Sequence, residues 1–238
     1  MPNASVVEFP VLNRPAVEGE FAACDLIYNL PDFPTLPETQ LTLELQMQER
    51  SADLSAIADT ILADLGATIQ ILRLAAREYQ YADEHPVRME DCIAGLGLEA
   101  CFEAITAGVR VRGVRSQVVY VLWNHAREIA GICRHLAEET PVLIAPDKAY
   151  LAGLLHAMDA VPAALGWISN EMAVHPACSA LKMAERWFLP SFLKDFFWEL
   201  SMPDENSHWS KLMAAAHHLA DRSCSGDSTC DFLIRSSE

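Results

Sequence analysis

The sequence predicts an all-α protein, and three observations support this. Of the 238 residues, 51% are hydrophobic and 21% are charged, which is the composition of a globular protein with a sizeable core. Alanine and leucine are abundant, whereas glycine occurs only 10 times, and this balance favours helices over strands. Apolar residues recur at steps of three and four, with no alternating strand pattern of any length.

The first half of the chain is expected to form a smaller helical layer, residues 26–112, after an extended lead-in over residues 1–25. Prolines at 31, 34 and 37 exclude a regular helix through that stretch of the layer. Pro37 nevertheless suits the first turn of a helix that follows. Ser51 is a suitable N-cap for the second helix, and Gly66 is a stop signal at its end. The expected helices start at residue 38 and then cover 51–66, 67–80, 89–97 and 98–109.

The second half, residues 113–222, is expected to form a larger bundle. A loop containing Arg110, Arg112 and Arg115 separates it from the first layer. The expected helices cover 116–140, 147–158, 163–172, 176–188, 190–200 and 206–222, which gives ten or eleven helices in all. Residues 223–238 are polar and rich in Gly and Ser, and we expect a flexible tail. No fixed-period repeat occurs, so a solenoid is not expected.

Charge, hydrophobicity and cysteine content indicate which partners and which cell compartment to expect. The net charge of −16 repels phosphate backbones, so we expect no nucleic-acid partner. We expect no secretory signal and no membrane partner, because no run approaches about 18 uninterrupted apolar residues. Seven cysteines without a CxxC pair suit a reduced, cytoplasmic protein. Cys224 and Cys230 could pair, but free thiols are the expectation.

Chemistry in this chain has to come from a cluster assembled from distant helices. Phosphate-binding glycine loops, the GxSxG nucleophile motif and the HExxH zinc motif are all missing from the sequence. In helical bundles, metal ligands project inward from several helices. Any one histidine alone is more usually a structural imidazole with a backbone partner. The candidates are His125, His156, Asp159, His175, His217, His218 and Asp221.

Seven segments follow one another in the order of a known helical family. They are "LPDFPTLPE", "LSAIADTILADLGATIQILRLA", "MEDCIAGLGLEACFEAI", "LWNHAREIAGICRHLA", "YLAGLLHAMDAVPAAL", "EMAVHPACSALKMAERWFLPSFL" and "LMAAAHHLADR". Each is weak alone, but the series in register resembles the HDOD domain from about residue 26 to 222. HDOD domains are signalling-output modules related to the HD phosphohydrolases. The resemblance therefore implies an HDOD-like fold, with an N-terminal helical subdomain followed by an HD-like bundle.

The resemblance also assigns positions to a metal site that this sequence has partly lost. His125 matches the first histidine of catalytic relatives, His156 matches the histidine of their His-Asp pair, and Asp221 matches their later aspartate. Ala157 replaces the aspartate of the pair. Relatives with two metals carry a His-His element near the position where this chain has Trp198 and Glu199.

The missing carboxylate predicts a degenerate site. Divalent ions in phosphohydrolases need several ligands at once, and carboxylates also neutralise their charge. Asp159 lies about 200° around a helix from Ala157, so it can substitute only if the helix ends between them. His217 and His218 precede Asp221 by one turn, which is a ligand-like spacing, but relatives place their ligand at the acid. A separate metal site there is therefore a minor alternative.

These observations predict a stand-alone bacterial HDOD module that regulates through protein contacts and has neither catalysis nor a cofactor. His125, His156, Ala157 and Asp221 would then be vestigial site positions. One alternative is a metal-dependent phosphohydrolase acting on a phosphodiester or nucleotide, and another is a nucleotide sensor that uses the emptied pocket. Whether the chain forms a homodimer stays open. The exposed side of residues 187–200 is the best candidate for an apolar contact surface, although ordinary core is an equally good interpretation.

Overall fold

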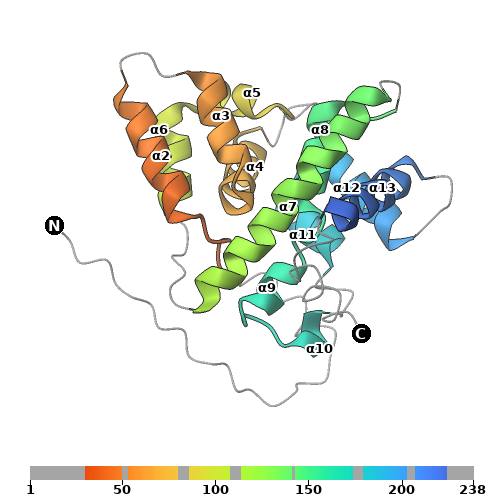
Figure 1. Ribbon diagram of the computed structural model, residues 1–238. Helices are drawn as coiled ribbons and strands as arrows, with labels where there is room; N and C mark the ends of the chain where they lie inside the picture. The colour runs from red at the N-terminus through yellow and green to blue at the C-terminus, as the bar shows by residue number, and fades with distance from the viewer. Residues whose placement is uncertain are drawn as a thin grey trace.

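The computed structural model describes residues 30–49, 53–79, 86–107, 114–140, 143–173, 179–202 and 207–223. Within these stretches the regular elements are all helices, which confirms the all-α prediction (Figure 1). They number twelve there, one more than the upper estimate, because the helix expected over 163–172 is interrupted. Gly166, with φ of 68°, follows the end of the first piece, and the left-handed conformation favours glycine and stops a helix.

The first five helices form the N-terminal layer, on one side of the molecule in Figure 1. They are α2 (Pro37–Gln48), α3 (Leu54–Leu62), α4 (Leu65–Glu78), α5 (Met89–Leu96) and α6 (Leu98–Thr106). Pro37 occupies the first turn of α2, as predicted. Asp53 caps α3 by accepting a hydrogen bond from the Ser55 N–H at 3.0 Å.

The remaining helices form the bundle, with the long helix α7 running diagonally across the molecule between the two groups (Figure 1). They are α7 (Val114–Glu139), α8 (Pro146–Leu155), α9 (Ala160–Ala164), α10 (Asn170–Ala173), α11 (Ala180–Arg186), α12 (Ser191–Ser201) and α13 (His208–Ser223). The domain boundary expected at residue 112 stays a prediction, since residues 108–113 lie outside the described stretches. The lead-in over residues 1–25 and nearly all of the tail over residues 223–238 also lie outside the described stretches, so the predictions for them are untested.

The prediction that Gly66 ends a helix is wrong. The chain turns at residues 63 and 64, and Gly66 lies in the first turn of the next helix, α4. A Cβ at this position would lie 2.0 Å from the carbonyl oxygen of Pro34. Glycine is therefore required there because the chain before α2 crosses the start of α4 too closely for any side chain.

Helix α4 belongs to two hydrophobic cores at once. Leu65, Ile69 and Leu72 join the core of the bundle, whereas Ala67 and Ile71 join the core of the N-terminal layer. The first half of α4, residues 65–72, is buried on all sides because it lies between the two cores. The two groups of helices therefore share α4 as common core material.

The buried carboxylate of Asp64 connects the two groups with hydrogen bonds. It caps α4 by accepting from the N–H groups of Gly66 and Ala67 at 2.9 and 3.1 Å. It also accepts from the Leu36 N–H at 2.7 Å and from the Trp123 indole N–H of α7 at 2.8 Å. Four N–H donors from three described segments thus meet at one fully buried side chain, and the Thr39 side chain is a further hydrogen-bond partner. Desolvation raises the pKa of Asp64, and these donors partly offset that effect.

Helices α7 and α8 approach closely because α8 carries a glycine at the contact. A Cβ on Gly153 would lie 2.8 Å from the Cα of Ala130 and 3.1 Å from the Cys133 sulfur. Small residues on both helices allow the two backbones to pack together along their lengths. This close packing brings the carboxyl end of α8 alongside the middle of α7.

In the part of the chain that the structure describes, no single helix is long and apolar enough to cross a membrane. The pair α3 and α4 passes the same test of length and composition only when taken together, across a bend of 114°. Among the described cysteines, Cys92, Cys101 and Cys133 are free and buried. Cys224 and Cys230 lie outside the described residues, so their pairing stays untested.

Candidate functional site

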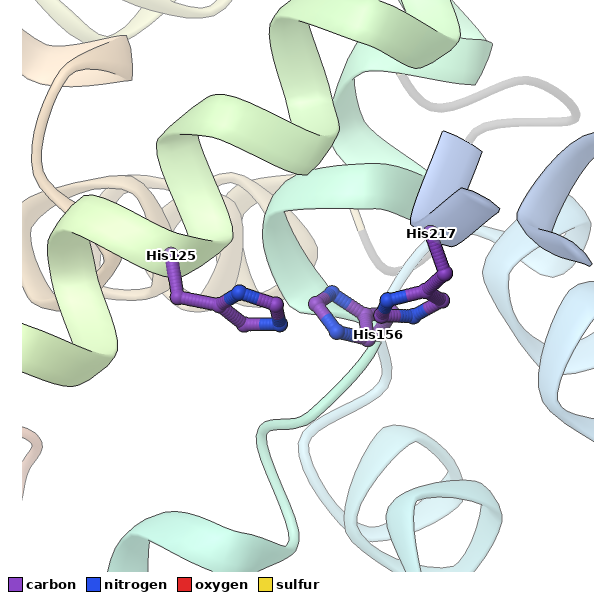
Figure 2. Close-up of side chains that lie close together, drawn as sticks. All are labelled: His125, His156 and His217. Carbon is purple, nitrogen blue, oxygen red and sulfur yellow. The ribbon is translucent and has the colours of Figure 1, made fainter. Parts of the chain in front are cut away.

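Three histidines from distant parts of the sequence meet inside the bundle (Figure 2). His125 comes from the middle of α7, His156 from the carboxyl end of α8, and His217 from α13. Their ring centroids lie 5.2 Å (His125–His156), 5.5 Å (His125–His217) and 5.0 Å (His156–His217) apart. Each offers a ring nitrogen within 4.8 Å of the others. We call this group the histidine cluster.

Local structure orients His156 within the cluster. It is the C-cap residue of α8, and its Nδ1 lies 2.7 Å from the carbonyl oxygen of Gly153. A carbonyl oxygen can only accept, so Nδ1 carries the proton in this contact. Nε2 is then left unprotonated, with its lone pair available. Gly153 thus both allows α8 to lie against α7 and fixes the tautomer of His156.

Burial keeps the cluster neutral. Desolvation, together with the neighbouring His217 and His125, lowers the pKa of His156 to about 3, although the hydrogen bond to the Gly153 carbonyl opposes the shift. Desolvation also lowers the pKa of His125 and of His217. The carboxylates of Glu128 and Asp221 oppose this at His125, and Asp221 opposes it at His217. At neutral pH the three rings are therefore uncharged imidazoles.

The lowered pKa of His156 predicts a loss of stability in mild acid. The unfolded chain takes up a proton below about pH 6.5, whereas folded His156 resists until about pH 3. Its stabilising contribution is thus present above pH 6.5 and falls by about 2 kcal/mol between pH 7 and pH 5. Asp64 and Asp159 have raised pKa values and act in the opposite direction, so a matched variant is needed.

Urea unfolding at pH 7 and pH 5, in EDTA, measures this effect. We expect the free energy of unfolding to fall with acid by about 2 kcal/mol less in His156→Gln than in the wild type. The two proteins share Asp64 and Asp159, so the difference isolates the imidazole. An equal acid dependence in both proteins would show that burial of His156 does not disfavour its protonation.

The acids expected near the site lie elsewhere or at its margin. Helix α8 ends at Leu155, before both Ala157 and Asp159 and not between them, so the 200° separation of a continuous helix does not apply to this pair. Asp159 nevertheless points to another partner, since its carboxylate accepts from the Ala180 N–H at the start of α11. Burial raises the pKa of this carboxyl. Asp159 does not belong to the ligand group of the histidine cluster.

Asp221 and His218 also fall outside the ligand group. Asp221 lies one turn beyond His217 on α13, is exposed, and acts on His125 and His217 only through its charge. His218 is exposed on the same helix. His175 lies outside the described residues. His217 therefore contributes to the cluster, whereas the resemblance assigned that position to Asp221.

Trp198 and Glu199, at the position of the relatives' His-His element, do not join the cluster either. Trp198 is 56% exposed. The Glu199 carboxylate accepts a hydrogen bond from the Ser207 hydroxyl, which begins the turn into α13. Glu199 thus serves the connection between α12 and α13. Much of the segment 187–200 is ordinary core, since α12 buries Phe192, Leu193, Phe196 and Phe197.

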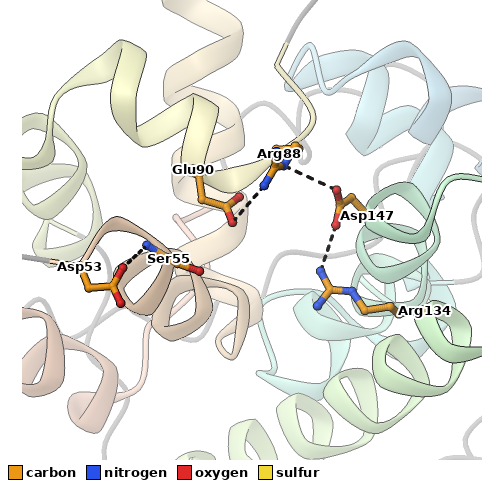
Figure 3. Close-up of polar contacts among 6 residues, drawn as sticks. All are labelled: Asp53, Ser55, Arg88, Glu90, Arg134 and Asp147. Carbon is orange, nitrogen blue, oxygen red and sulfur yellow. Dashed lines mark hydrogen bonds and ion pairs between the residues drawn. The ribbon is translucent and has the colours of Figure 1, made fainter. Parts of the chain in front are cut away.

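A cavity of about 190 Å³ lies away from the cluster, where α3 and α5 face α7 and α8. Arg88 lies 3.6 Å from Glu90 and 3.8 Å from Asp147, and Arg134 contacts Asp147 at 3.1 Å (Figure 3). Tyr150 lines the same space and donates a hydrogen bond to the Leu62 carbonyl at 3.0 Å. These ion pairs are partly exposed, and such pairs contribute little to stability. They connect the N-terminal layer and the bundle.

Comparisons with solved structures show known proteins that share this fold. The response regulator MmoQ from Methylococcus capsulatus matches over 82% of this chain and 88% of its own, with a TM-score of 0.65 and 20% identity. A virulence factor from Campylobacter jejuni matches over 83% of this chain and 78% of its own, with a TM-score of 0.51 and 14% identity. At these identities the likeness shows the fold. No curated protein matches.

The family model for the HDOD domain matches residues 33–173. This stretch includes His125, His156 and Ala157, whereas His217 lies beyond it. The matched residues make up more than half of the chain. They run from the segment before α2 to the end of α10 and so include both the N-terminal layer and the central pair α7 and α8. The protein therefore belongs to the HDOD domain family.

Proposed function

We propose that this protein is a bacterial, cytoplasmic regulatory module that acts through contacts with other proteins and does not hydrolyse phosphate esters. The observation that carries the proposal is the composition of the histidine cluster. Its ligand group among the described residues is three imidazoles, whereas phosphohydrolases of the HD type rely on carboxylates around their metals. Membership in the HDOD family and a fold shared with the response regulator MmoQ support a signalling role.

Without carboxylate ligands, the site lacks the groups that hold metal ions for the hydrolysis of a phosphate ester. In metal-assisted hydrolysis, acids hold hard divalent ions near the phosphate and balance their charge while water attacks. Here Ala157 offers no ligand atom, and the carboxylate of Asp159 accepts a backbone N–H of α11 instead. An ion bound only by neutral imidazoles would receive no negative charge from its ligands, whereas carboxylate ligands supply it.

A strained, exposed aromatic residue supports the protein-contact part of the proposal. Phe188 lies in the turn from α11 to α12, has φ of 54°, and is 65% exposed. The left-handed conformation costs an aromatic residue about 1–2 kcal/mol, and glycine would avoid this cost. Strain retained at an exposed apolar side chain points to a function for that side chain. Trp198 and Met202, four residues apart at the end of α12, are also more than half exposed.

The absence of catalysis is tested with the wild type and Ala157→Asp. Both proteins are assayed with Mn²⁺, Fe²⁺ and Zn²⁺ against a phosphodiester, a nucleotide and a cyclic dinucleotide. We expect no metal-dependent hydrolysis by either protein, because Trp198 and Glu199 would still replace the His-His element of relatives with two metals. Turnover by the wild type that His125→Ala abolishes would overturn the proposal and support the phosphohydrolase alternative. Turnover by Ala157→Asp alone would show that one carboxylate is the whole difference.

Phe188→Gly tests the protein contact separately from the fold. We expect this variant to be at least as stable as the wild type in urea unfolding, because it relieves the left-handed strain. We also expect it to lose a partner that the wild-type protein retains in co-purification from the native host. Leu143→Ala, at another residue that is 58% exposed, is the control and should retain the partner. Equal retention by Phe188→Gly would remove this surface from the proposal.

A further inference from the structure

We propose that the histidine cluster is a binding site for a zinc-like transition-metal ion, with His125, His156 and His217 as its three protein ligands. The inference is independent of the proposed protein contacts. Two of the positions coincide with those that catalytic relatives use, but the third ligand is supplied by α13 one turn before Asp221. That substitution changes the ligand type from carboxylate oxygen to imidazole nitrogen. The site would therefore favour an ion that prefers nitrogen ligands.

The spacing of the rings fits one tetrahedral ion. A Zn–N bond is about 2.0–2.1 Å, and a ring nitrogen lies about 1.1 Å from the ring centroid, so imidazoles on a tetrahedral ion have centroids about 5.2 Å apart. The three observed centroid distances are 5.2, 5.5 and 5.0 Å. The rings converge from three helices with nitrogens facing the space between them (Figure 2). Small rotations of the side chains would bring one nitrogen of each ring to the ion.

The chemistry of the ligands selects the ion. Neutral imidazole nitrogens suit Zn²⁺, Cu²⁺, Ni²⁺ and Co²⁺, whereas Mg²⁺ and Ca²⁺ require oxygen ligands. His156 already has the arrangement that ligating histidines usually have, with Nδ1 donating to the Gly153 carbonyl and Nε2 left for the ion. Asp221 acts electrostatically on His125 and His217. Its carboxylate would therefore balance part of the charge of a bound ion.

A bound ion would join three elements that are far apart in the sequence. His125 and His156 belong to the tightly packed pair α7 and α8, whereas His217 is on α13, which packs against α7. The ion would thus fix α13 to the centre of the bundle. Because the complete cluster exists only in the folded chain, the ion should stabilise the fold by mass action.

The test uses the full chain without a histidine tag, stripped with EDTA, dialysed and kept reduced. We expect it to bind one equivalent of Zn²⁺ in a calorimetric titration. At a free concentration of about 100 times its Kd, Zn²⁺ should raise Tm by about 5–10 °C. Millimolar Mg²⁺ should neither compete nor stabilise. Co²⁺ in place of Zn²⁺ should give the intense visible absorption of a four- or five-coordinate ion with nitrogen ligands.

Adjacent histidines on α13 provide matched variants. His217→Ala removes a partly buried ligand and should weaken Zn²⁺ binding by about 100-fold or more, as expected when one of three ligands is lost. His218→Ala removes an exposed histidine outside the cluster and should leave binding unchanged. Circular dichroism checks that both variants fold, and His125→Ala is a second ligand variant. Equal Zn²⁺ affinity in His217→Ala and His218→Ala, or no stoichiometric binding by the wild type, would overturn the site.

Discussion

Asp64→Ala should lose at least about 4 kcal/mol of stability, because each buried donor left without an acceptor costs about 1–3 kcal/mol. Four such donors bind this carboxylate: the backbone N–H groups of Leu36, Gly66 and Ala67, and the indole N–H of Trp123. The total stability of a natural domain is about 5–15 kcal/mol, so the variant should be barely folded. Urea unfolding followed by circular dichroism and Trp fluorescence measures the loss.

Asp53→Ala is the matched control, since Asp53 is also an N-cap aspartate. It is exposed, and among the described residues its carboxylate accepts from the Ser55 N–H (Figure 3). Its loss should cost about 0.5–1 kcal/mol, the ordinary effect of removing a cap at the surface. If the two alanine variants are equally stable, the connection between the two groups of helices at Asp64 contributes no more than one helix cap.

Gly153→Ala should destabilise the protein by about 1–3 kcal/mol, the usual cost of inserting atoms into a closely packed contact. The new methyl group would meet the backbone of Ala130 at 2.8 Å, and backbone atoms of a long helix cannot move aside as a side chain can. Helices α7 and α8 would have to separate. The same separation should displace His156 from His125, so Zn²⁺ affinity should fall together with the free energy of unfolding.

Gly131→Ala tests whether the contact, and not glycine itself, is responsible. Gly131 is an exposed residue within α7, and a Cβ there would meet nothing within 4 Å. Alanine should therefore stabilise the helix by about 0.5–1 kcal/mol, because glycine loses more backbone entropy on folding. Opposite signs for the two substitutions are the expected result. A stabilising Gly153→Ala would show that the two helices tolerate a wider separation.

The helices could be predicted from the sequence because their apolar spacing and caps are local signals. Gly66 shows the limit of such signals. A glycine after an apolar run indicates a helix end, but here it allows a close approach by the carbonyl of Pro34, 32 positions earlier. The role of Asp64 could not be predicted for a similar reason. Its donors on Gly66 and Ala67 are local, but those on Leu36 and Trp123 are 28 and 59 positions away in the sequence.

The third ligand of the cluster illustrates what a sequence comparison leaves undetermined. His217 and Asp221 are four residues apart and lie on the same side of α13. Which of them reaches the rings on α7 and α8 depends on the tilt and axial position of α13, and these are set by tertiary packing. The resemblance indicates residue 221, whereas the structure brings residue 217 to the cluster. His125 and His156, which the sequence also offered as candidates, lie together because both come from the closely packed central pair α7 and α8.

The hydrogen bond between Asp64 and Trp123 restricts how this fold can be recombined. A chimera joined near residue 112 would take the carboxylate from one parent and the indole from the other. It would keep its stability only if both parents use this pair, because α4 also contributes side chains to both cores. The N-terminal layer and the bundle are therefore expected to be inherited together, as a single unit that cannot be exchanged in parts.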